Sequence, residues 1–313
     1  MPLKSISFLE TPLSSLSRSL QHEWDVTFRL LRSNATGFLF IFIGGLLARA
    51  ISTPLPMAET ASLVITTIVV GVLCSYVFDI ANQTTSPEED YINKPYRPIP
   101  AGLININQAR ARWLLAWTIG PTFVYLLFGV WAMLHLLHWE FLICVCYVWP
   151  RWFSWFMRNF FGSFSYFILG RLLNQVLAKE AQYWNIGFLI DLSIFAWFMA
   201  TMHIQEFYDL EGDRKTDRNT LPMLLSPRGL KALRAGTSLF IVVFSSGLSF
   251  AGYRRVARDK LIAPAYILQQ VSSCVLAYRI WASKSPEMDK ITYHAYYYFS
   301  VLMILLSLVL ISK

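Results

Sequence analysis

The chain has 313 residues, of which 55% are hydrophobic and only 15% are charged. This composition is typical of a protein that crosses a membrane several times, and it excludes an ordinary soluble domain. Polar and apolar residues do not alternate as they do in membrane strands, so we expect helical spans. The net charge of +8 fits membrane orientation and phosphate binding, and no nucleic-acid-binding module accompanies it.

Residues 1–35 precede the first long apolar run, which begins too late in the chain for a secretory signal. We predict that this segment forms an amphipathic helix on the membrane surface, separate from a single transmembrane domain over 36–313. The apolar stripe of that helix would hold Leu20, Trp24, Phe28 and Leu31, and its charged face Arg29 and Arg32.

Apolar stretches of the length that a bilayer requires, about 20 residues, follow one another through the rest of the chain. We predict about nine spans, at 36–53, 61–81, 112–133, 139–157, 160–178, 184–204, 232–251, 261–282 and 292–311. The fold class is therefore an all-α integral membrane protein. Lysine and arginine are concentrated on the side that carries the loops 82–111 and 205–231, which places both loops in the cytosol. A basic cluster at 254–260 argues weakly against this orientation.

The first of these loops contains Asn82 and Asp90, eight residues apart, with Ser86 midway and Pro87 after it. Glu88 and Glu89 lie beyond that proline. Lys94 and Arg97 follow within a run of three prolines, which restrict the backbone and so fix how the two cations are presented.

The second loop holds three carboxylates, Glu206, Asp209 and Asp213, at spacings i, i+3 and i+7. On a helix this spacing aligns them on one face. Hard oxygen ligands of this kind suit magnesium, which usually shares them with substrate phosphates. The alternative is that both loops are merely charged, solvated surface, and their presence on one membrane side makes that reading the weaker one.

The two loops resemble the signatures of the UbiA superfamily of intramembrane prenyltransferases. The first is similar to the family's Asn-Asp-x-x-Asp-x-x-x-Asp motif and its Asn-Lys-Pro-x-Arg-Pro-Ile-Pro-x-Gly run, the latter intact from Asn93 to Gly102. The second resembles Asp-x-x-Asp-x-x-x-Asp followed by Gly-Asp-Arg-Lys and by Thr-Leu-Pro at 220–222. The resemblance spans roughly residues 30–311. It implies helices around a central cavity, Mg²⁺ as cofactor and an isoprenoid diphosphate as substrate.

The resemblance also implies roles for individual residues. Asn82 and Asp90, helped by Glu89, would hold one metal, and Asp209 and Asp213, with Glu206 in place of an aspartate, would hold the second. Asn82, Asp90, Asp209 and Asp213 would thus be catalytic. The cations expected to hold the diphosphate are Lys94, Arg97, Arg158, Arg214 and Lys215.

The first motif departs from the family pattern at Gln83 and Ser86, where aspartates are usual. This form is similar to a fungal branch that includes terpene cyclases, which implies cyclisation of a farnesyl or geranylgeranyl diphosphate in the endoplasmic reticulum. Aromatic residues on the fifth and sixth predicted helices are candidates for stabilising a carbocation. The alternative is transfer of the prenyl group to an aromatic or other lipophilic acceptor. A transporter is the remote alternative, and the sequence does not predict an oligomeric state.

Two aspartates lie within predicted spans, where an ionisable residue is by default a candidate for function. For Asp191 an ion pair with Arg171 is the structural alternative. Asp79 lies one turn before Asn82 and is predicted to orient it.

Overall fold

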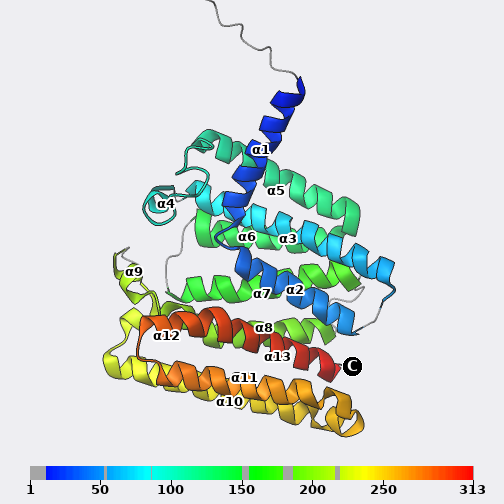
Figure 1. The fold of residues 1–313 in the computed structure, drawn as a ribbon, viewed down its shortest axis with the longest axis vertical. Helices are drawn as coiled ribbons and strands as arrows, with labels where there is room; N and C mark the ends of the chain where they lie inside the picture. The colour runs from blue at the N-terminus through cyan, green and yellow to red at the C-terminus, as the bar shows by residue number, and fades with distance from the viewer. Residues whose placement is uncertain are drawn as a thin grey trace, which may run out of the picture.

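The computed structural model describes residues 12–52, 55–85, 87–149, 155–178, 186–215 and 219–312. Within these ranges every regular element is a helix, which confirms the predicted fold class. The long helices run side by side in Figure 1, apart from the N-terminal helix, which crosses them, and the short helices α4 (Pro87–Asn93) and α9 (Leu210–Lys215) lie at one edge.

The elements follow one another with short connections. The first half contains α1 (Pro12–Leu31), α2 (Ala35–Ser52), α3 (Met57–Thr85), α4 (Pro87–Asn93), α5 (Ile106–Phe128), α6 (Val130–Ile143), the π-helix η1 (Cys144–Val148) and α7 (Trp155–Ala178). The second half contains α8 (Ile186–Thr201), η2 (Met202–Glu206), α9 (Leu210–Lys215), η3 (Leu221–Leu224), α10 (Pro227–Arg258), η4 (Lys260–Ile262), α11 (Ala263–Ala282), α12 (Pro286–Ile291), η5 (Thr292–Tyr297) and α13 (Tyr298–Ser312).

Seven helical segments among the described residues are long and apolar enough to cross a bilayer, and Gly37–Leu47 is a shorter apolar segment. The remaining two predicted spans coincide with the helices α2, which contains the apolar segment Gly37–Leu47, and α7. The count of nine therefore stays a prediction. The boundary between the third and fourth predicted spans differs from the expected one, because Gly129, at φ 86°, separates α5 from α6. A positive φ is readily adopted by glycine, so the chain turns there.

Two hydrophobic cores hold the bundle together. One joins α2, α3, α6 and α7, around fully buried residues such as Leu136 and Leu169. The other joins α8, α10, α11 and α13, around Trp197 and Tyr297. Figure 1 shows these two groups as the upper and lower parts of the bundle, with α7 and α8 adjacent at their junction.

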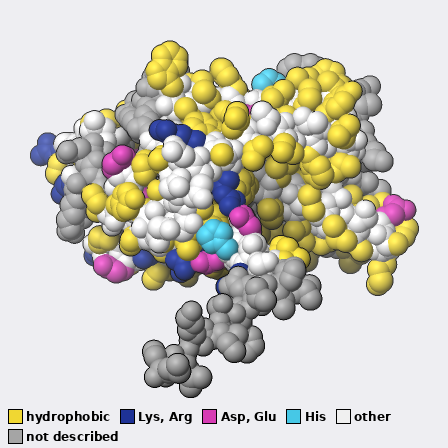
Figure 2. All heavy atoms as spheres, turned by 90° about the horizontal axis from the view of Figure 1, so that it is seen from above, with side chains coloured by type: hydrophobic (Ala, Val, Ile, Leu, Met, Phe, Trp, Pro, Cys, Tyr) yellow, Lys and Arg dark blue, Asp and Glu magenta, His cyan; other side chains and the backbone are white. Residues whose placement is uncertain are grey.

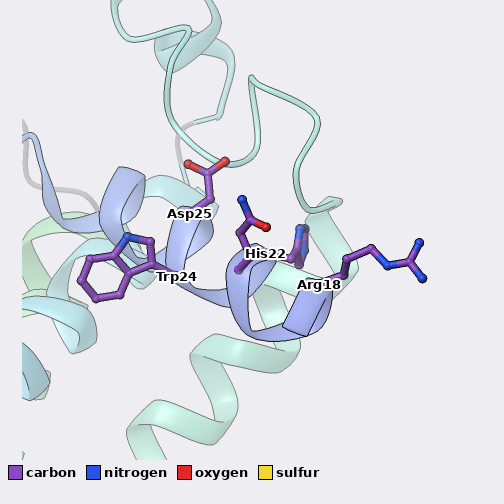
Figure 3. A pocket seen from close by; sticks show the side chains of 5 residues that line it. Arg18, His22, Trp24 and Asp25 are labelled. Carbon is purple, nitrogen blue, oxygen red and sulfur yellow. The ribbon is translucent and has the colours of Figure 1, made fainter. Parts of the chain in front are cut away.

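The N-terminal helix α1 packs against α3 through Val26 and Leu30, which are buried beside Ile80. Its opposite stripe, Leu16, Leu20, Trp24 and Phe28, is exposed. Figure 3 shows a surface hollow along this helix, where Trp24 and Arg18 lie on different sides. A helix therefore forms in this segment, and its place on the membrane surface, separate from the transmembrane domain, stays a prediction. Residues 1–11 lie outside the described part of the chain.

Candidate active site

The two acidic loops meet at one end of the bundle. Arg158, in the first turn of α7, forms an ion pair with Asp213 of the second loop, with Nη1 and Oδ1 3.7 Å apart. The same guanidinium is near enough to Lys94 of the first loop to interact with it electrostatically. Figure 2 shows charged side chains gathered toward one end of the molecule and hydrophobic ones over much of the remainder. Arg158 therefore lies between the two loops, as the phosphate role predicted for it requires.

In the first loop, Asp90 and Arg97 pair with each other. Arg97 Nη1 donates to both carboxylate oxygens of Asp90 at 2.7 Å, and Nη2 donates to Ser33 Oγ at 2.7 Å. Both side chains are buried. The predicted metal ligand and the predicted phosphate ligand thus satisfy each other and tie the loop to the connection between α1 and α2.

Two further hydrogen bonds link the end of α3 to α1 and to the connection that follows α1. Gln83 Nε2 donates to the carbonyl oxygen of Leu30 at 2.8 Å, and Asn34 Nδ2 donates to Asp79 Oδ1 at 2.5 Å. Gln83, which occupies a position where the family motif has an acid, therefore anchors the end of α1. Asp79 is hydrogen-bonded to Asn34, and no contact in which it orients Asn82 is among those described. Asn82 itself is half-buried.

Lys94 of the first loop lies among other charged groups, Arg158 of α7 included. Burial lowers its pKa, the positive charge of Arg97 lowers it further, and Asp90 and Asp79 act in the opposite direction. An anion placed beside this ammonium group would favour its charged form.

The second loop is not one helix, so the expectation that its three carboxylates share a helical face is wrong. Glu206 ends η2, and Asp213 belongs to α9, which begins after Asp209. The spacing also does not reveal the contact that Glu206 makes. Glu206 turns toward η3, where its Oε2 accepts from the backbone N–H of Leu221 at 3.2 Å.

The break still leaves Glu206 and Asp213 close together. The two carboxylates are near enough to interact electrostatically, and each also interacts with Arg158. Both are buried, with exposed fractions of 1%, and Glu206 Oε1 has no hydrogen-bond partner among the described residues. Burial raises the pKa of Asp213, and the Arg158 guanidinium opposes this rise. Burying carboxylates is costly unless a cation accompanies them.

The other predicted site residues are either exposed or outside the described part of the molecule. Asp209 and Arg214 are exposed, and Asp209 lies near enough to Asp213 to raise its pKa. Ser86 and the side chains of Glu89 and Lys215 lie outside the described part of the molecule, so their predicted roles stay untested.

The donor set fits a metal that is shared with phosphate. Among the described residues, no group of three or more histidine, cysteine, aspartate or glutamate side chains has the geometry of a protein-only metal site. Magnesium is commonly held by one or two carboxylates together with water and substrate phosphates. The pair Glu206 and Asp213, with Glu206 Oε1 lacking a described partner, provides such a partial site.

Comparison with known proteins assigns the family. The UbiA prenyltransferase family model matches residues 38–309, most of the chain. The chain belongs to the UbiA prenyltransferase family. It is 28% identical, over 88% of its own length and 89% of the relative's, to somaliensene A/B synthase of Streptomyces somaliensis. It is 26% identical to diterpene cyclase eriG of Hericium erinaceus, over 71% of this chain and 68% of the relative.

The fold agrees with that assignment. A solved structure described as digeranylgeranylglyceryl phosphate synthase superposes with a TM-score of 0.61 over 93% of this chain and 98% of that one, at 15% identity. This UbiA-family protein is accordingly an enzyme that acts on a prenyl diphosphate.

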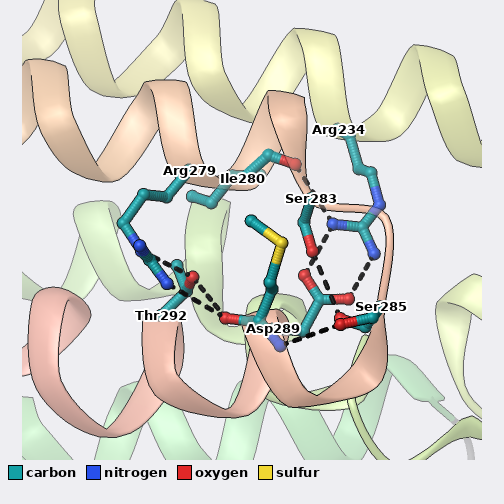
Figure 4. Close-up of polar contacts among 8 residues, drawn as sticks. Arg234, Arg279, Ile280, Ser283, Ser285, Asp289 and Thr292 are labelled. Atoms are coloured by element: carbon teal, nitrogen blue, oxygen red, sulfur yellow. Dashed lines mark hydrogen bonds and ion pairs between the residues drawn. The ribbon is translucent and has the colours of Figure 1, made fainter.

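One arginine that supports the second loop of this UbiA-family enzyme escaped prediction. Arg234 of α10 donates through Nη1 and Nη2 to the two carboxylate oxygens of Asp289, at 2.8 and 2.6 Å, and also to the carbonyl oxygen of Ile280 (Figure 4). Its guanidinium lies 4.0 Å from the ring centroid of Phe207, the neighbour of Glu206. Arg234 and Asp289 are 55 residues apart, so no local pattern could have linked them.

The intramembrane aspartate has a structural role. Asp191 Oδ2 accepts from Asn174 Nδ2 at 2.8 Å and lies 3.5 Å from Arg171 Nη1. Gly170 permits the approach, because a Cβ there would lie 2.6 Å from Asp191 Oδ1. The pairing with Arg171, given as the structural alternative, is confirmed.

The candidate aromatic residues fall into three groups. Phe161 packs with Phe78, Trp139 and Tyr147. Phe160, Phe164 and Phe167 pack around Phe195. Tyr166 stacks on Phe198, with ring centroids 3.8 Å apart, and Trp197 contacts both Phe198 and Tyr297. All three groups include α7, the helix that begins with Arg158.

Proposed function

We propose that this protein ionises a farnesyl or geranylgeranyl diphosphate with the aid of Mg²⁺ and cyclises the resulting cation to a terpene. The observation that carries the proposal is the meeting of Glu206, Asp213 and Arg158, with Lys94 nearby, at the end of an aromatic-rich helix. Two acids and two cations at one place suit a diphosphate that brings a divalent metal with it.

Each charged group has a defined task in this reaction. Arg158 and Lys94 bind diphosphate oxygens, with Arg214 and Lys215 as further cations on α9. Glu206, Asp209 and Asp213 hold Mg²⁺ from the second loop and Asn82 holds it from the first, with Glu89 as an additional acid. When bound, the metal would neutralise charge on the leaving group.

Asp90 and Arg97 first keep the loop in place through their mutual pair. Metal and phosphate would compete with that pair, because both described hydrogen bonds of the Asp90 carboxylate come from Arg97.

The bond changes are those of an ionisation. The allylic C–O bond breaks, and both of its electrons leave with the pyrophosphate. A double bond of the same substrate attacks the cation, and loss of a proton gives the cyclic hydrocarbon. The aromatic faces near Tyr166 and Phe198 would stabilise positive charge as it moves along the chain.

Similarity to proteins named as a synthase of somaliensene and as a diterpene cyclase favours cyclisation. Gln83 and Ser86 point the same way, because these departures from the family motif resemble the fungal branch that includes terpene cyclases. Transfer to a lipophilic acceptor is the second candidate, favoured by the family's prenyltransferase description. The transporter reading loses support, because Asp191 and Arg171 pair with each other.

The deciding experiment incubates the purified protein, in detergent and Mg²⁺, with farnesyl or geranylgeranyl diphosphate and no acceptor. We expect pyrophosphate and a cyclic terpene in equal amounts. Product that forms only when an aromatic acceptor is added, and that carries the prenyl group on that acceptor, would establish transfer instead.

We also propose that both loops face the cytosol, in the endoplasmic reticulum. A single cysteine placed in loop 205–231, in a background without native cysteines, should react with a membrane-impermeant thiol reagent only from the cytosolic face. Labelling from the opposite face of intact vesicles would reverse the orientation.

A further inference from the structure

Several buried oxygen atoms around the second acidic loop have no hydrogen-bond partner among the described residues. They are Glu206 Oε1, Asn159 Oδ1 and Thr220 Oγ1. All three side chains are at least nine-tenths buried, with exposed fractions of 1%, 4% and 0%. Buried polar atoms are normally hydrogen-bonded, so a group of three without partners requires an explanation.

Printed contacts bring the backbones of these residues to one place. Thr220 precedes Leu221, whose N–H donates to Glu206 Oε2. Asn159 follows Arg158, whose guanidinium pairs with Asp213. Asn159 also lies three residues before Gly162, so the two share a helical face, and a Cβ at Gly162 would lie 3.1 Å from Met202 of η2. That face of α7 is therefore directed at the segment that ends in Glu206.

We propose that Asn159 and Thr220 are additional oxygen ligands of the divalent cation held by Glu206 and Asp213. This inference rests on the proposed function, because it extends the same metal–diphosphate site. The side-chain amide oxygen and the hydroxyl oxygen are hard, neutral donors of the kind that Mg²⁺ accepts. They add ligands without adding negative charge next to an anionic substrate.

The chemistry of the atoms distinguishes this place from the first loop. There the buried atoms without described partners are Asp79 Oδ2, Gln83 Oε1 and the donor Arg97 Nε. A mixture of donors and acceptors can be satisfied by water. Around the second loop, Glu206 and Asn159 present acceptors, and Thr220 presents a hydroxyl that can also accept. A cation satisfies such a set.

Direct metal binding tests the proposal independently of turnover. The full-length protein in detergent is titrated with Mn²⁺ in the presence of inorganic pyrophosphate, and the bound ion is measured by electron paramagnetic resonance. We expect Asn159→Leu and Thr220→Val to weaken Mn²⁺ binding about tenfold each. Asn159→Asp and Thr220→Ser, which keep an oxygen at the same place, should retain at least about one third of the wild-type affinity for Mn²⁺.

Ser165→Ala is the matched control, because Ser165 is a buried hydroxyl on the same helix that donates to its own helix carbonyl at Phe161. It should leave Mn²⁺ affinity unchanged. Unchanged affinity in Asn159→Leu and Thr220→Val, with the thermal stability of both variants intact, would overturn the proposal. If either variant fails to fold, the oxygen-retaining variants decide: a loss of affinity in Asn159→Asp as large as in Asp213→Ala would also overturn it.

The two proposals fail separately. A wild-type protein that binds Mn²⁺ and pyrophosphate but releases no pyrophosphate from prenyl diphosphates contradicts the proposed reaction and leaves the ligand set standing. A wild-type protein that turns over, with Asn159→Leu binding Mn²⁺ normally, contradicts the ligand set alone.

Discussion

The two acidic loops have similar compositions, but they differ in the buried polar atoms that they leave without hydrogen-bond partners. In the first, Asp90 pairs with Arg97, Arg97 also donates to Ser33, and Gln83 donates to the carbonyl oxygen of Leu30. The atoms there without described partners include a donor, Arg97 Nε, as well as the acceptor Gln83 Oε1. In the second, Glu206 keeps an oxygen without a described partner, and Asp213 forms an ion pair with Arg158. We infer from this difference that two similar motifs can have different roles in one site. One loop fixes the architecture of the site, and the other retains the coordinating capacity.

The largest effect on turnover is expected from a substitution of Asp213, in the second loop. Asp213→Ala should reduce the release of pyrophosphate at least about 100-fold, because the metal-bound leaving group loses a buried carboxylate. Initial rates with a prenyl diphosphate and saturating Mg²⁺ measure the effect. Asp25→Ala, which removes a half-exposed carboxylate of α1 that pairs with Arg29, serves as the control. Near-normal turnover in Asp213→Ala would remove the second loop from the chemistry.

The buried pair of the first loop gives the next largest effect. Arg97→Ala leaves Asp90 as an unpaired buried charge, so the free energy of unfolding should fall by about 3–5 kcal/mol. Arg97→Lys keeps a charge but loses the planar guanidinium, whose Nη1 donates to Asp90 while Nη2 donates to Ser33. Its free energy of unfolding should lie between those of Arg97→Ala and the wild type. Thermal denaturation in detergent provides the measurement.

A double variant, Asp90→Leu with Arg97→Met, separates architecture from ligand binding. Replacing both charges with apolar groups should recover most of the lost stability. If turnover recovers as well, the pair is only structural. If stability recovers and turnover does not, Asp90 and Arg97 also contact the substrate or its metal, as the resemblance to the family implies.

The resemblance to the family implied that the two loops would face each other and that Arg158 would lie near them, because the motifs that carry it are local in the sequence. It could not predict the pairing of Asp90 with Arg97, since eight residues of loop allow many arrangements. The helical spacing of Glu206, Asp209 and Asp213 was misleading, because the bond from Leu221 to Glu206 is not visible in that spacing. The turn at Gly129 was missed because two apolar helices join there almost without a polar break.

Arg234, which lies outside both loops, tests whether the position of Glu206 depends on its neighbours. Arg234→Ala should destabilise the protein by about 2 kcal/mol, since it removes charged hydrogen bonds to Asp289 and the stacking on Phe207. Turnover should fall about tenfold, through a higher Mg²⁺ requirement, because Phe207 is next to Glu206.

Arg279→Ala is its matched control within the same cluster (Figure 4). Arg279 contacts Thr292 and the ring of Tyr296, and none of its described contacts is with the second loop. It should lower stability with little change in the Mg²⁺ requirement. An equal shift of the Mg²⁺ requirement in both variants would show that Arg234 acts only on general stability.

Substitution of Gln83 has the smallest expected effect on stability and turnover, and it tests whether the first loop can still hold a metal. Gln83→Ala removes one neutral hydrogen bond, to the carbonyl oxygen of Leu30, and should cost about 1 kcal/mol of stability. Turnover should change less than about threefold, because this side chain anchors α1 and holds no metal. Gln83→Asp restores the acid of the family motif at this position but cannot donate to Leu30, so it should be less stable than Gln83→Ala. A gain in Mg²⁺ affinity in Gln83→Asp would show that the first loop retains a place for the metal, and that this chain has exchanged that place for the anchoring of its N-terminal helix.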